Sequence, residues 1–322
     1  MAEPTGHHGR VDVPGFSYSL PPDDDHGAHP MTSGRSPGGR LPRQVQNGLR
    51  GPRGKVEWAK LYASSTRSAM RNPDFADLEH FCFFIGYSRS GHTLIGTALN
   101  AHPEMVISHE LDAVSYVRHG FRRSQLFSLI LERDQHFGLM GRTWSGYKYE
   151  IPGQSQGTFD RLRVIGDKRA RSSALQISSH PELLDRLRRV VGVPIRVIHV
   201  TRNPFDNIAT EARRHKLSLT DATAWYAQIC DAIGVVRPLL DPSELLDVRY
   251  EAFTASPQAT LVDICRFLDV EPGASYLEAC AGIVWPSTNR SRDAIEWTVD
   301  ERRGVEQLVE KHSALHSYDF EH

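Results

Sequence analysis

The chain has 322 residues, of which 39% are hydrophobic and 24% are charged, and its formal net charge at pH 7 is −1. A chain of this length and hydrophobic content can bury one large core with appendages. Its near-zero net charge provides no basic field for binding nucleic acid, so we expect no nucleic-acid partner.

No apolar run approaches the length of a membrane-spanning helix, and no signal-peptide core follows Met1. The four cysteines lie far apart, mostly among apolar residues, and lack the spacing of a metal site. We therefore expect a soluble, cytoplasmic protein with reduced cysteines and no metal. The sequence does not indicate an oligomeric state.

The chain begins with a segment of unusual composition, residues 1–54, which is rich in Gly and Pro and has almost no apolar periodicity. Such a segment cannot bury enough apolar surface to offset the entropy lost on ordering, so we expect a disordered tail. Residues 55–79 form a helical lead-in, in which Trp58, Leu61 and Tyr62 favour a short helix. The main folded domain is expected over residues 80–322.

A buried strand is predicted over residues 81–86, where the apolar run Phe81 to Ile85 ends at a glycine. A short polar loop follows, and a helix is predicted over residues 92–101. A strand, a glycine-rich turn and a helix start leave backbone N–H groups unpaired, and the helix dipole there favours negative charge. The loop is therefore expected to bind an anion, most simply a phosphate.

The loop differs at one position from the loops that bind nucleoside triphosphates. Gly86 and Gly91 have the required spacing, and Thr93 supplies the hydroxyl group. His92, however, stands where a Lys would reach the phosphates, and a neutral imidazole is a poor substitute for an ammonium group. Arg89, inside the loop, is the available cation.

A second motif follows the strand predicted over residues 195–201. That strand ends in Thr201-Arg202, where a magnesium-binding Asp would be expected in a nucleotide kinase. Asn203 and Pro204 suit the N-cap and the first position of a helix. Thr210 and Arg214 are four residues apart on that helix and share a face. The sequence therefore indicates a nucleotide end held by fixed cations without a metal.

The remaining predicted elements alternate between strands and helices. Further strands are predicted over 105–108, 163–166 and 245–249. Helices are predicted over 121–133, 172–190, 204–214, 219–239, 257–268, 274–281 and 300–312, with a loop-rich stretch over 138–160. This alternation predicts a P-loop-like, three-layer α/β fold with a central parallel sheet and helices on both faces. The motif residues follow strand carboxyl ends, where such sheets bind ligands.

Three segments resemble the sulfotransferases that use 3′-phosphoadenosine 5′-phosphosulfate (PAPS), above all the tyrosylprotein type and its bacterial relatives. The loop G-Y-S-R-S-G-H-T, followed by A-H-P, is similar to their G-x-P-R-S-G-T-T loop. Arg202-Asn203-Pro204, with Thr210 eight positions after the Arg, is similar to their second motif, and Arg249-Tyr250-Glu251 to their third. Tyr87 and Ser88 depart from the usual small-Pro pair in the loop.

The resemblance implies a PAPS-dependent sulfotransferase, with its catalytic domain over residues 80–322 and 3′,5′-phosphoadenosine as a product. It implies that the 5′-phosphosulfate is bound by the loop residues Arg89, Ser90, Gly91, His92 and Thr93. It also implies that the 3′-phosphate is bound by Arg202, Thr210 and Arg214, or Arg213 in its place, and that Tyr250 contacts the nucleotide. Arg290 and Arg292, or Arg302 and Arg303, would complete the cover of the nucleotide.

The resemblance also suggests a catalytic base after the strand predicted over 105–108. Glu110 lies 21 positions after Arg89, the interval of the base in the tyrosylprotein type. His109 is the rival base, because an imidazole titrates near neutrality. If the strand continues through both residues, their side chains point to opposite faces, so one of them would face the acceptor.

Lys168 follows the strand predicted over 163–166 and matches the family's Lys that stabilises the transferring sulfuryl group, a role that Arg89 would share. Ala170 stands where cytosolic small-molecule sulfotransferases have a catalytic His, which favours Glu110 as the base. Asp167 either holds Lys168 in place or forms a surface ion pair. Ser287 resembles a late Ser that assists at the sulfuryl site of the tyrosylprotein type.

The acceptor is not indicated by the sequence. Its contacts are expected from residues 111–160, where acidic and basic residues are nearly balanced, so a polyanionic acceptor has no support. A small molecule, carbohydrate, lipid or peptide with a hydroxyl or amine group would each suit. Two other functions are considered: a P-loop-type nucleotide kinase, which needs His92 to act for a Lys, and a phosphoadenosine-binding module without catalysis.

Overall fold

The fold is that of a computed structural model, which describes residues 55–70, 75–144, 147–285 and 288–321. The tail predicted over 1–54 and the predicted site residue Ser287 lie outside the described residues.

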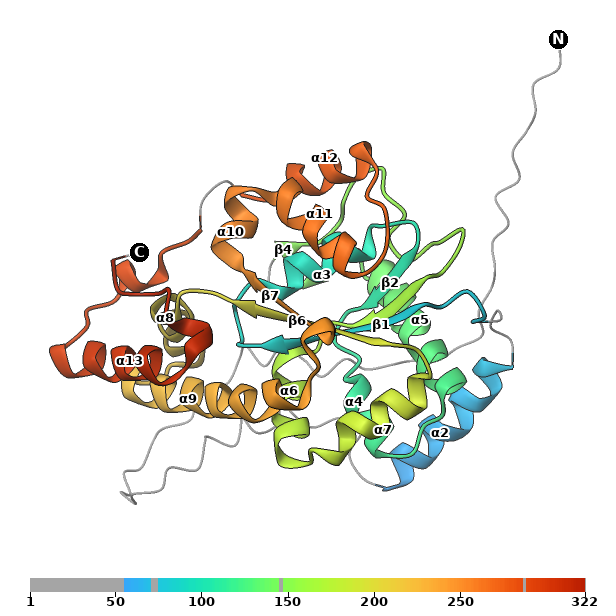
Figure 1. The fold of residues 1–322 in the computed structure, drawn as a ribbon, viewed down its shortest axis with the longest axis horizontal. Helices are drawn as coiled ribbons and strands as arrows, with labels where there is room; N and C mark the ends of the chain where they lie inside the picture. Colours follow the sequence, from blue (N-terminus) through green and yellow to red (C-terminus); the bar gives the residue numbers. More distant parts are fainter. Residues whose placement is uncertain (1–54, 71–74, 145–146, 286–287, 322) are drawn as a thin grey trace, which may run out of the picture. The chain divides into compact units, whose positions relative to one another are not determined.

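The elements alternate between strands and helices along the chain (Figure 1). The strands are β1 (His80–Gly86), β2 (Met105–Ser108), β3 (Thr143–Trp144), β4 (Tyr147–Lys148), β5 (Val164–Asp167), β6 (Ile195–Thr201) and β7 (Leu245–Arg249). The α-helices are α2 (Lys55–Ala69), α3 (His92–Asn100), α4 (Ala113–Arg118), α5 (Arg123–Leu139), α6 (Ala170–Ser179), α7 (Glu182–Val191), α8 (Pro204–His215), α9 (Leu219–Val236), α10 (Tyr250–Ala255), α11 (Pro257–Phe267), α12 (Ala274–Gly282) and α13 (Val299–Lys311). Short 3₁₀ turns are η1 (Arg237–Leu239), η2 (Pro242–Glu244), η3 (Ser291–Ala294) and η4 (Ser313–Leu315).

Five strands form one parallel sheet in the order β2-β5-β1-β6-β7, and β3 and β4 form a separate hairpin. The central strand is β1, whose Phe81 is in register with Ile165 of β5 and Ile195 of β6. The chain leaves β1 for one side of the sheet and later crosses to the other side. The connections therefore change direction at β1, and the carboxyl end of a strand at such a point is where parallel sheets bind ligands.

The two faces of the sheet carry separate hydrophobic cores. Phe81, Phe83 and Ile85 of β1 belong to the core under α4–α9, while Cys82 and Phe84 belong to the core under α3 and α10–α12. This alternation follows from the period of two in a strand. In Figure 1, α10–α12 accordingly lie on one side of the sheet and α6, α7 and α9 on the other. The predicted three-layer fold with a central parallel sheet is confirmed.

The strands predicted over 105–108, 195–201 and 245–249 match β2, β6 and β7 at both ends. The helix predicted over 121–133 is wrong in extent, because α5 ends six residues later, at Leu139. Among the α-helices and strands, α4, α10 and the β3–β4 hairpin were not predicted. Arg249, which precedes α10, is not a preferred N-cap residue, whereas Asp112, which precedes α4, is one, although its side chain forms no cap hydrogen bond.

The helical lead-in packs on the main domain through α2. The amide of Gln125 in α5 donates to the backbone carbonyl of Tyr62 at 3.1 Å, and the indole of Trp58 stacks on the ring of His119 at 3.7 Å. Among the helices of the described part of the chain, none is long and apolar enough to cross a membrane.

Candidate active site

The loop after β1 ends in a helix start with free backbone donors. Leu94 and Ile95 donate to the carbonyl of Gly91 at 3.0 and 3.3 Å. The N–H groups before them therefore point out of the end of α3, where an anion is favoured. Gly91 has a φ of 89°, and a Cβ atom there would lie 2.0 Å from Cδ2 of Tyr250. The structure thus places Tyr250 directly on the loop.

The hydroxyl and imidazole groups of the loop are both uncharged. The Ser90 hydroxyl donates to the carbonyl of Tyr87 at 2.8 Å and lies 3.4 Å from Nδ1 of His92. Burial, together with the charge of Lys168, lowers the pKa of His92 to about 3, so this ring is neutral at physiological pH. Tyr87 is buried and stacks on Tyr226 at 4.5 Å, which explains its departure from the family's loop as core packing.

Arg202, which follows β6, lies against the same loop. Its Nη1 donates to the carbonyl of Arg89 at 3.2 Å, its Nη2 donates to the carbonyl of Asn289, and its guanidinium lies 5.5 Å from the ring centre of Tyr250. Its Nε is buried without a hydrogen-bond partner. Among the described residues it has no carboxylate partner. The structure therefore brings the first loop, Arg202 and Tyr250 together.

The residues on α8 that were predicted to bind the 3′-phosphate have fewer contacts with Arg202 and the loop. The hydroxyl of Thr210 donates to the hydroxyl of Ser291 at 3.0 Å, and Ser291 lies two residues after Asn289, whose carbonyl accepts from Arg202. Arg214 is exposed. Arg292, one of the arginines predicted to cover the nucleotide, instead forms a buried ion pair with Asp206 at 3.0 Å and ties η3 to α8.

Lys168 forms the centre of the site. Its Nζ donates to Oγ1 of Thr93 at 2.8 Å and to Oε1 of Glu110 at 2.9 Å, and its side chain is only 2% exposed. The other carboxylate oxygen of Glu110 accepts from Nη1 of Arg169 at 2.7 Å. Each oxygen of Glu110 therefore has its own cationic partner. Arg169 was not predicted as a site residue.

These contacts set the charge states of the central groups. Burial alone would raise the pKa of Glu110, but the charges of Lys168 and Arg169 outweigh it and hold that pKa well below its usual range. Burial lowers the pKa of Lys168, and the carboxylate of Glu110 opposes this change. The carboxylate is thus ionised, as a proton acceptor must be, but it is held by two cations.

The side chain of His109 lies among aromatic rings, whereas that of Glu110 lies between two cations. Its ring stacks on Phe137 at 4.2 Å and meets Trp144 edge-on at 4.8 Å. Burial, with the charge of Lys168, holds the pKa of His109 well below its usual range. Its Nε2 is buried without a partner among the described residues, and the ring lines a small cavity that Lys168 and Thr93 also line.

Asp167 fixes the turn that carries Glu110. Its carboxylate accepts from the backbone N–H groups of Leu111, Asp112 and Ala113 at 2.8 to 2.9 Å and from the Ser108 hydroxyl at 3.0 Å. Neither alternative considered for Asp167 describes these contacts, since it neither bonds Lys168 nor lies at the surface. The sequence could not show this, because the donors lie more than fifty positions away.

Gly96 in α3 makes room for Lys168. A Cβ atom at Gly96 would lie 2.7 Å from Cγ of Lys168, closer than side chains approach. A glycine inside an otherwise apolar helix is the signal that could have identified it, because such a residue usually has a packing reason.

Replacing Gly96 with Ala is expected to lower the turnover rate of this site about tenfold or more, because the new methyl group displaces Lys168 from Thr93 and Glu110. Steady-state kinetics would measure this, with Gly304→Ala as the control. Gly304 also lies inside a helix but has no atom within 4 Å of its added Cβ. The control should gain about 0.5–1 kcal/mol of stability and keep full activity. Full activity of Gly96→Ala would contradict the packing role.

Comparison with known proteins identifies a family whose model matches most of the folded part of the chain. A model of the sulfotransferase family matches residues 82–272, a range that contains Glu110, Lys168 and Arg202. No curated protein matches the chain. Among solved structures, the chain is similar to the sulfotransferase domain of the olefin synthase from Synechococcus PCC 7002, with 17% identity, a TM-score of 0.49, and 77% of this chain and 98% of that chain covered. It is also similar to sulfotransferase STF1 from Mycobacterium tuberculosis H37Rv (14% identity, TM-score 0.47, 85% and 86% covered) and to mouse sulfotransferase SULT7A1 complexed with PAP (12%, 0.40, 73% and 85%).

Proposed function

The chain belongs to the sulfotransferase family, and we propose that it moves a sulfuryl group from PAPS to a hydroxyl or amine of its acceptor, with Glu110 as the base. The observation that carries the proposal is the cluster of Glu110, Lys168 and Thr93 at the carboxyl edge of the sheet. A carboxylate, a buried ammonium and the hydroxyl of an anion-binding loop lie within hydrogen-bond distance there. Sulfuryl transfer needs such a base and such charge stabilisation.

The arrangement of cations suits a donor with phosphate at two positions. The helix start after Gly91 would receive the 5′-phosphosulfate, because its backbone N–H groups point outward. Arg202 would receive the 3′-phosphate. Its guanidinium is nearly buried and, among the described residues, is hydrogen-bonded to backbone carbonyls and lies against a tyrosine ring, so an anion would complete its hydrogen bonds.

In the proposed reaction, Glu110 accepts the proton of the acceptor hydroxyl while the acceptor oxygen forms its bond to sulfur. The bond between sulfur and the 5′-phosphate oxygen breaks, and its electron pair remains on the phosphate of 3′,5′-phosphoadenosine. Lys168 turns from Glu110 toward the bond between sulfur and the 5′-phosphate oxygen, where negative charge develops on the leaving oxygen in the transition state. Because Glu110 then loses one of its two cationic partners, it becomes a stronger base when the donor is bound.

Calorimetry with 3′,5′-phosphoadenosine and with ADP tests the donor assignment. We expect the wild-type protein to bind 3′,5′-phosphoadenosine about 10- to 100-fold more tightly than ADP. The reason is the charge-assisted hydrogen bond from Arg202 to the 3′-phosphate, since such a bond contributes roughly 1.5–3 kcal/mol. Arg202→Ala should remove most of this preference. Arg196→Ala is the control, because Arg196 lies near the opposite end of β6. Equal affinity of the wild-type protein for both nucleotides would contradict a 3′-phosphate site.

A further inference from the structure

A second arginine without a counter-ion lies in the first turn of α6. The guanidinium of Arg171 lies 4.0 Å from the ring centre of Trp225 in α9. Its Nε is buried without a hydrogen-bond partner, and no carboxylate of the described residues lies within 4.0 Å of it. Arg171 is itself half-buried and Trp225 almost fully buried. A charged group has thus been taken out of water and placed on an aromatic face.

Such an arrangement is costly unless an anion completes it. An isolated charge loses hydration on burial, and a cation–π contact recovers only part of that loss. Burial lowers the pKa of Arg171 to about 10, and the charge of Glu211 opposes this change. Glu211 does not form the missing ion pair. Its Oε2 lies instead 3.1 Å from Nε2 of His215, without hydrogen-bond geometry.

Arg171 lies close in the chain to the residues around Glu110. Arg169, which precedes α6 and contacts Glu110, is two residues before Arg171. The first turn of α6 follows the carboxyl end of β5, the sheet edge that carries Lys168. Apart from Lys168, the groups assigned above to the donor follow β1 and β6. Binding of the donor, as proposed above, assigns no role to Arg171.

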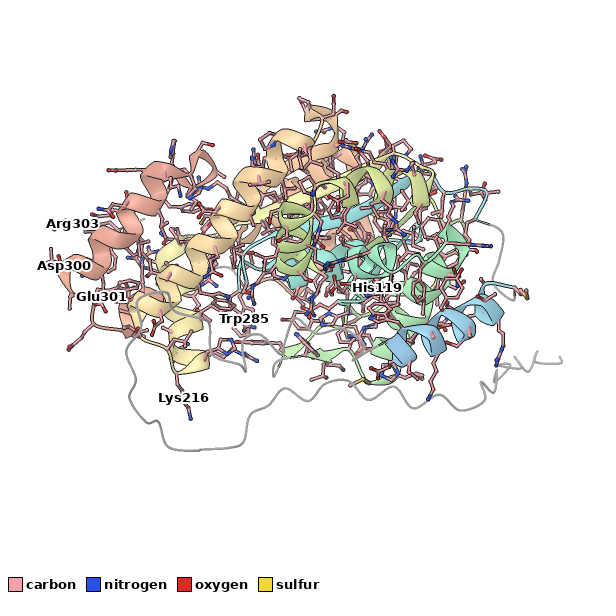
Figure 2. The ribbon with its side chains drawn as sticks, turned by 90° about the horizontal axis from the view of Figure 1, so that it is seen from below. His119, Lys216, Trp285, Asp300, Glu301 and Arg303 are labelled. Atoms are coloured by element: carbon pink, nitrogen blue, oxygen red, sulfur yellow. The ribbon has the colours of Figure 1, made fainter. Side chains whose placement is uncertain are left out.

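The cluster also reaches the surface. His215, at the end of α8, is exposed and meets the indole of Trp225 edge-on at 5.9 Å. Figure 2 shows the next residue, Lys216, with its side chain pointing away from the body of the protein. Arg171 itself is only half-buried, so part of this residue remains accessible to a ligand group from solvent. Nε1 of Trp225 is buried without an acceptor and provides a second unsatisfied donor.

We propose that the acceptor carries a carboxylate or another oxyanion, and that Arg171, presented on the indole of Trp225, binds this group while the nucleophile of the acceptor reaches Glu110. The proposal rests on the sulfotransferase function above. A planar guanidinium can hold an oxyanion through two parallel hydrogen bonds, which orients the bound molecule as well as attracting it. The anion would fix one end of the acceptor and leave the other at the base.

The test measures binding of benzoate to the full-length protein saturated with 3′,5′-phosphoadenosine, with benzamide as the uncharged match. Saturation excludes benzoate from the donor site. We expect benzoate to quench tryptophan fluorescence, because Arg171 stacks on Trp225, and benzamide to bind at least tenfold more weakly. Arg171→Met should lower benzoate affinity at least tenfold, and Arg171→Lys should restore part of it. Arg196→Met, which removes a guanidinium stacked on Phe267 near the other end of β6, should leave it unchanged.

Two results would overturn the proposal. One is equal binding of benzoate and benzamide to the wild-type protein, and the other is benzoate binding that Arg171→Met does not weaken. Thermal melting supplies a second measurement. Removal of an uncompensated charge should leave the midpoint of Arg171→Met unchanged or raise it, whereas a structural pair with Glu211 would make it fall. If 3′,5′-phosphoadenosine does not bind at all, the donor assignment fails instead, and the two failures are thereby distinguished.

Discussion

Replacing Glu110 with Gln is expected to lower the rate of sulfuryl transfer by about 10²- to 10⁴-fold, the usual contribution of a positioned general base. Gln keeps the shape of the side chain and can still accept from Lys168, but it cannot take up the acceptor proton. Affinity for 3′,5′-phosphoadenosine should stay close to that of the wild-type protein, because the loop and Arg202 are unchanged. Single-turnover kinetics with labelled PAPS, alongside calorimetry, would separate the two quantities.

His109→Gln is the matched control for this experiment. The ring of His109 stacks on Phe137 and takes no part in the hydrogen bonds among Lys168, Glu110 and Arg169, so its loss should change the rate by less than tenfold. A large loss in His109→Gln with an active Glu110→Gln would reverse the assignment of the base. A melting curve for each variant shows whether the protein is folded, because Glu110→Gln leaves two cations without a carboxylate.

The fold could be predicted from local patterns because its strands are short, mostly apolar segments. The segment Ile195 to Val200 is followed by Thr201-Arg202-Asn203-Pro204, which contains both the strand end and the helix start, and β6 ends and α8 begins accordingly. The same reasoning located Arg89 and Arg202 at one edge of the sheet. Their segments do meet there, since Arg202 donates to the carbonyl of Arg89.

The supporting residues of the site could not be predicted, because their roles depend on contacts between distant parts of the chain. Arg169 looks like an ordinary basic residue beside Lys168 until Glu110, in a separate turn, is placed against it. Arg171 looks like a solvated helix residue until α9 covers it with Trp225. Sequence patterns locate residues that face a ligand along one element, whereas packing between elements decides which charges are paired.

Replacing Asp167 should lower the stability of the protein strongly, because its carboxylate fixes a backbone turn. The turn it holds is unusual, because Glu110 and Asp112 both have positive φ values, 55° and 72°, which are rare for residues other than glycine. Three backbone N–H groups of this turn point at the Asp167 carboxylate. Burial raises the pKa of Asp167, and these N–H bonds oppose the rise. The carboxylate therefore holds Glu110 in position without a hydrogen bond to Lys168.

Asp167→Ala is expected to lower the free energy of unfolding by roughly 3–5 kcal/mol, because each buried N–H group left without an acceptor costs about 1–3 kcal/mol. The melting midpoint should fall by about 10 °C. Asp231→Ala, which breaks an exposed pair with Lys311, should cost less than about 1 kcal/mol.

Asp167→Asn retains one carbonyl acceptor, so it should fold and bind 3′,5′-phosphoadenosine yet transfer sulfuryl groups at least tenfold more slowly. If both Asp167 variants melt and react like the wild-type protein, the turn does not depend on this carboxylate, and Glu110 must be positioned by its ion pairs with Lys168 and Arg169 alone.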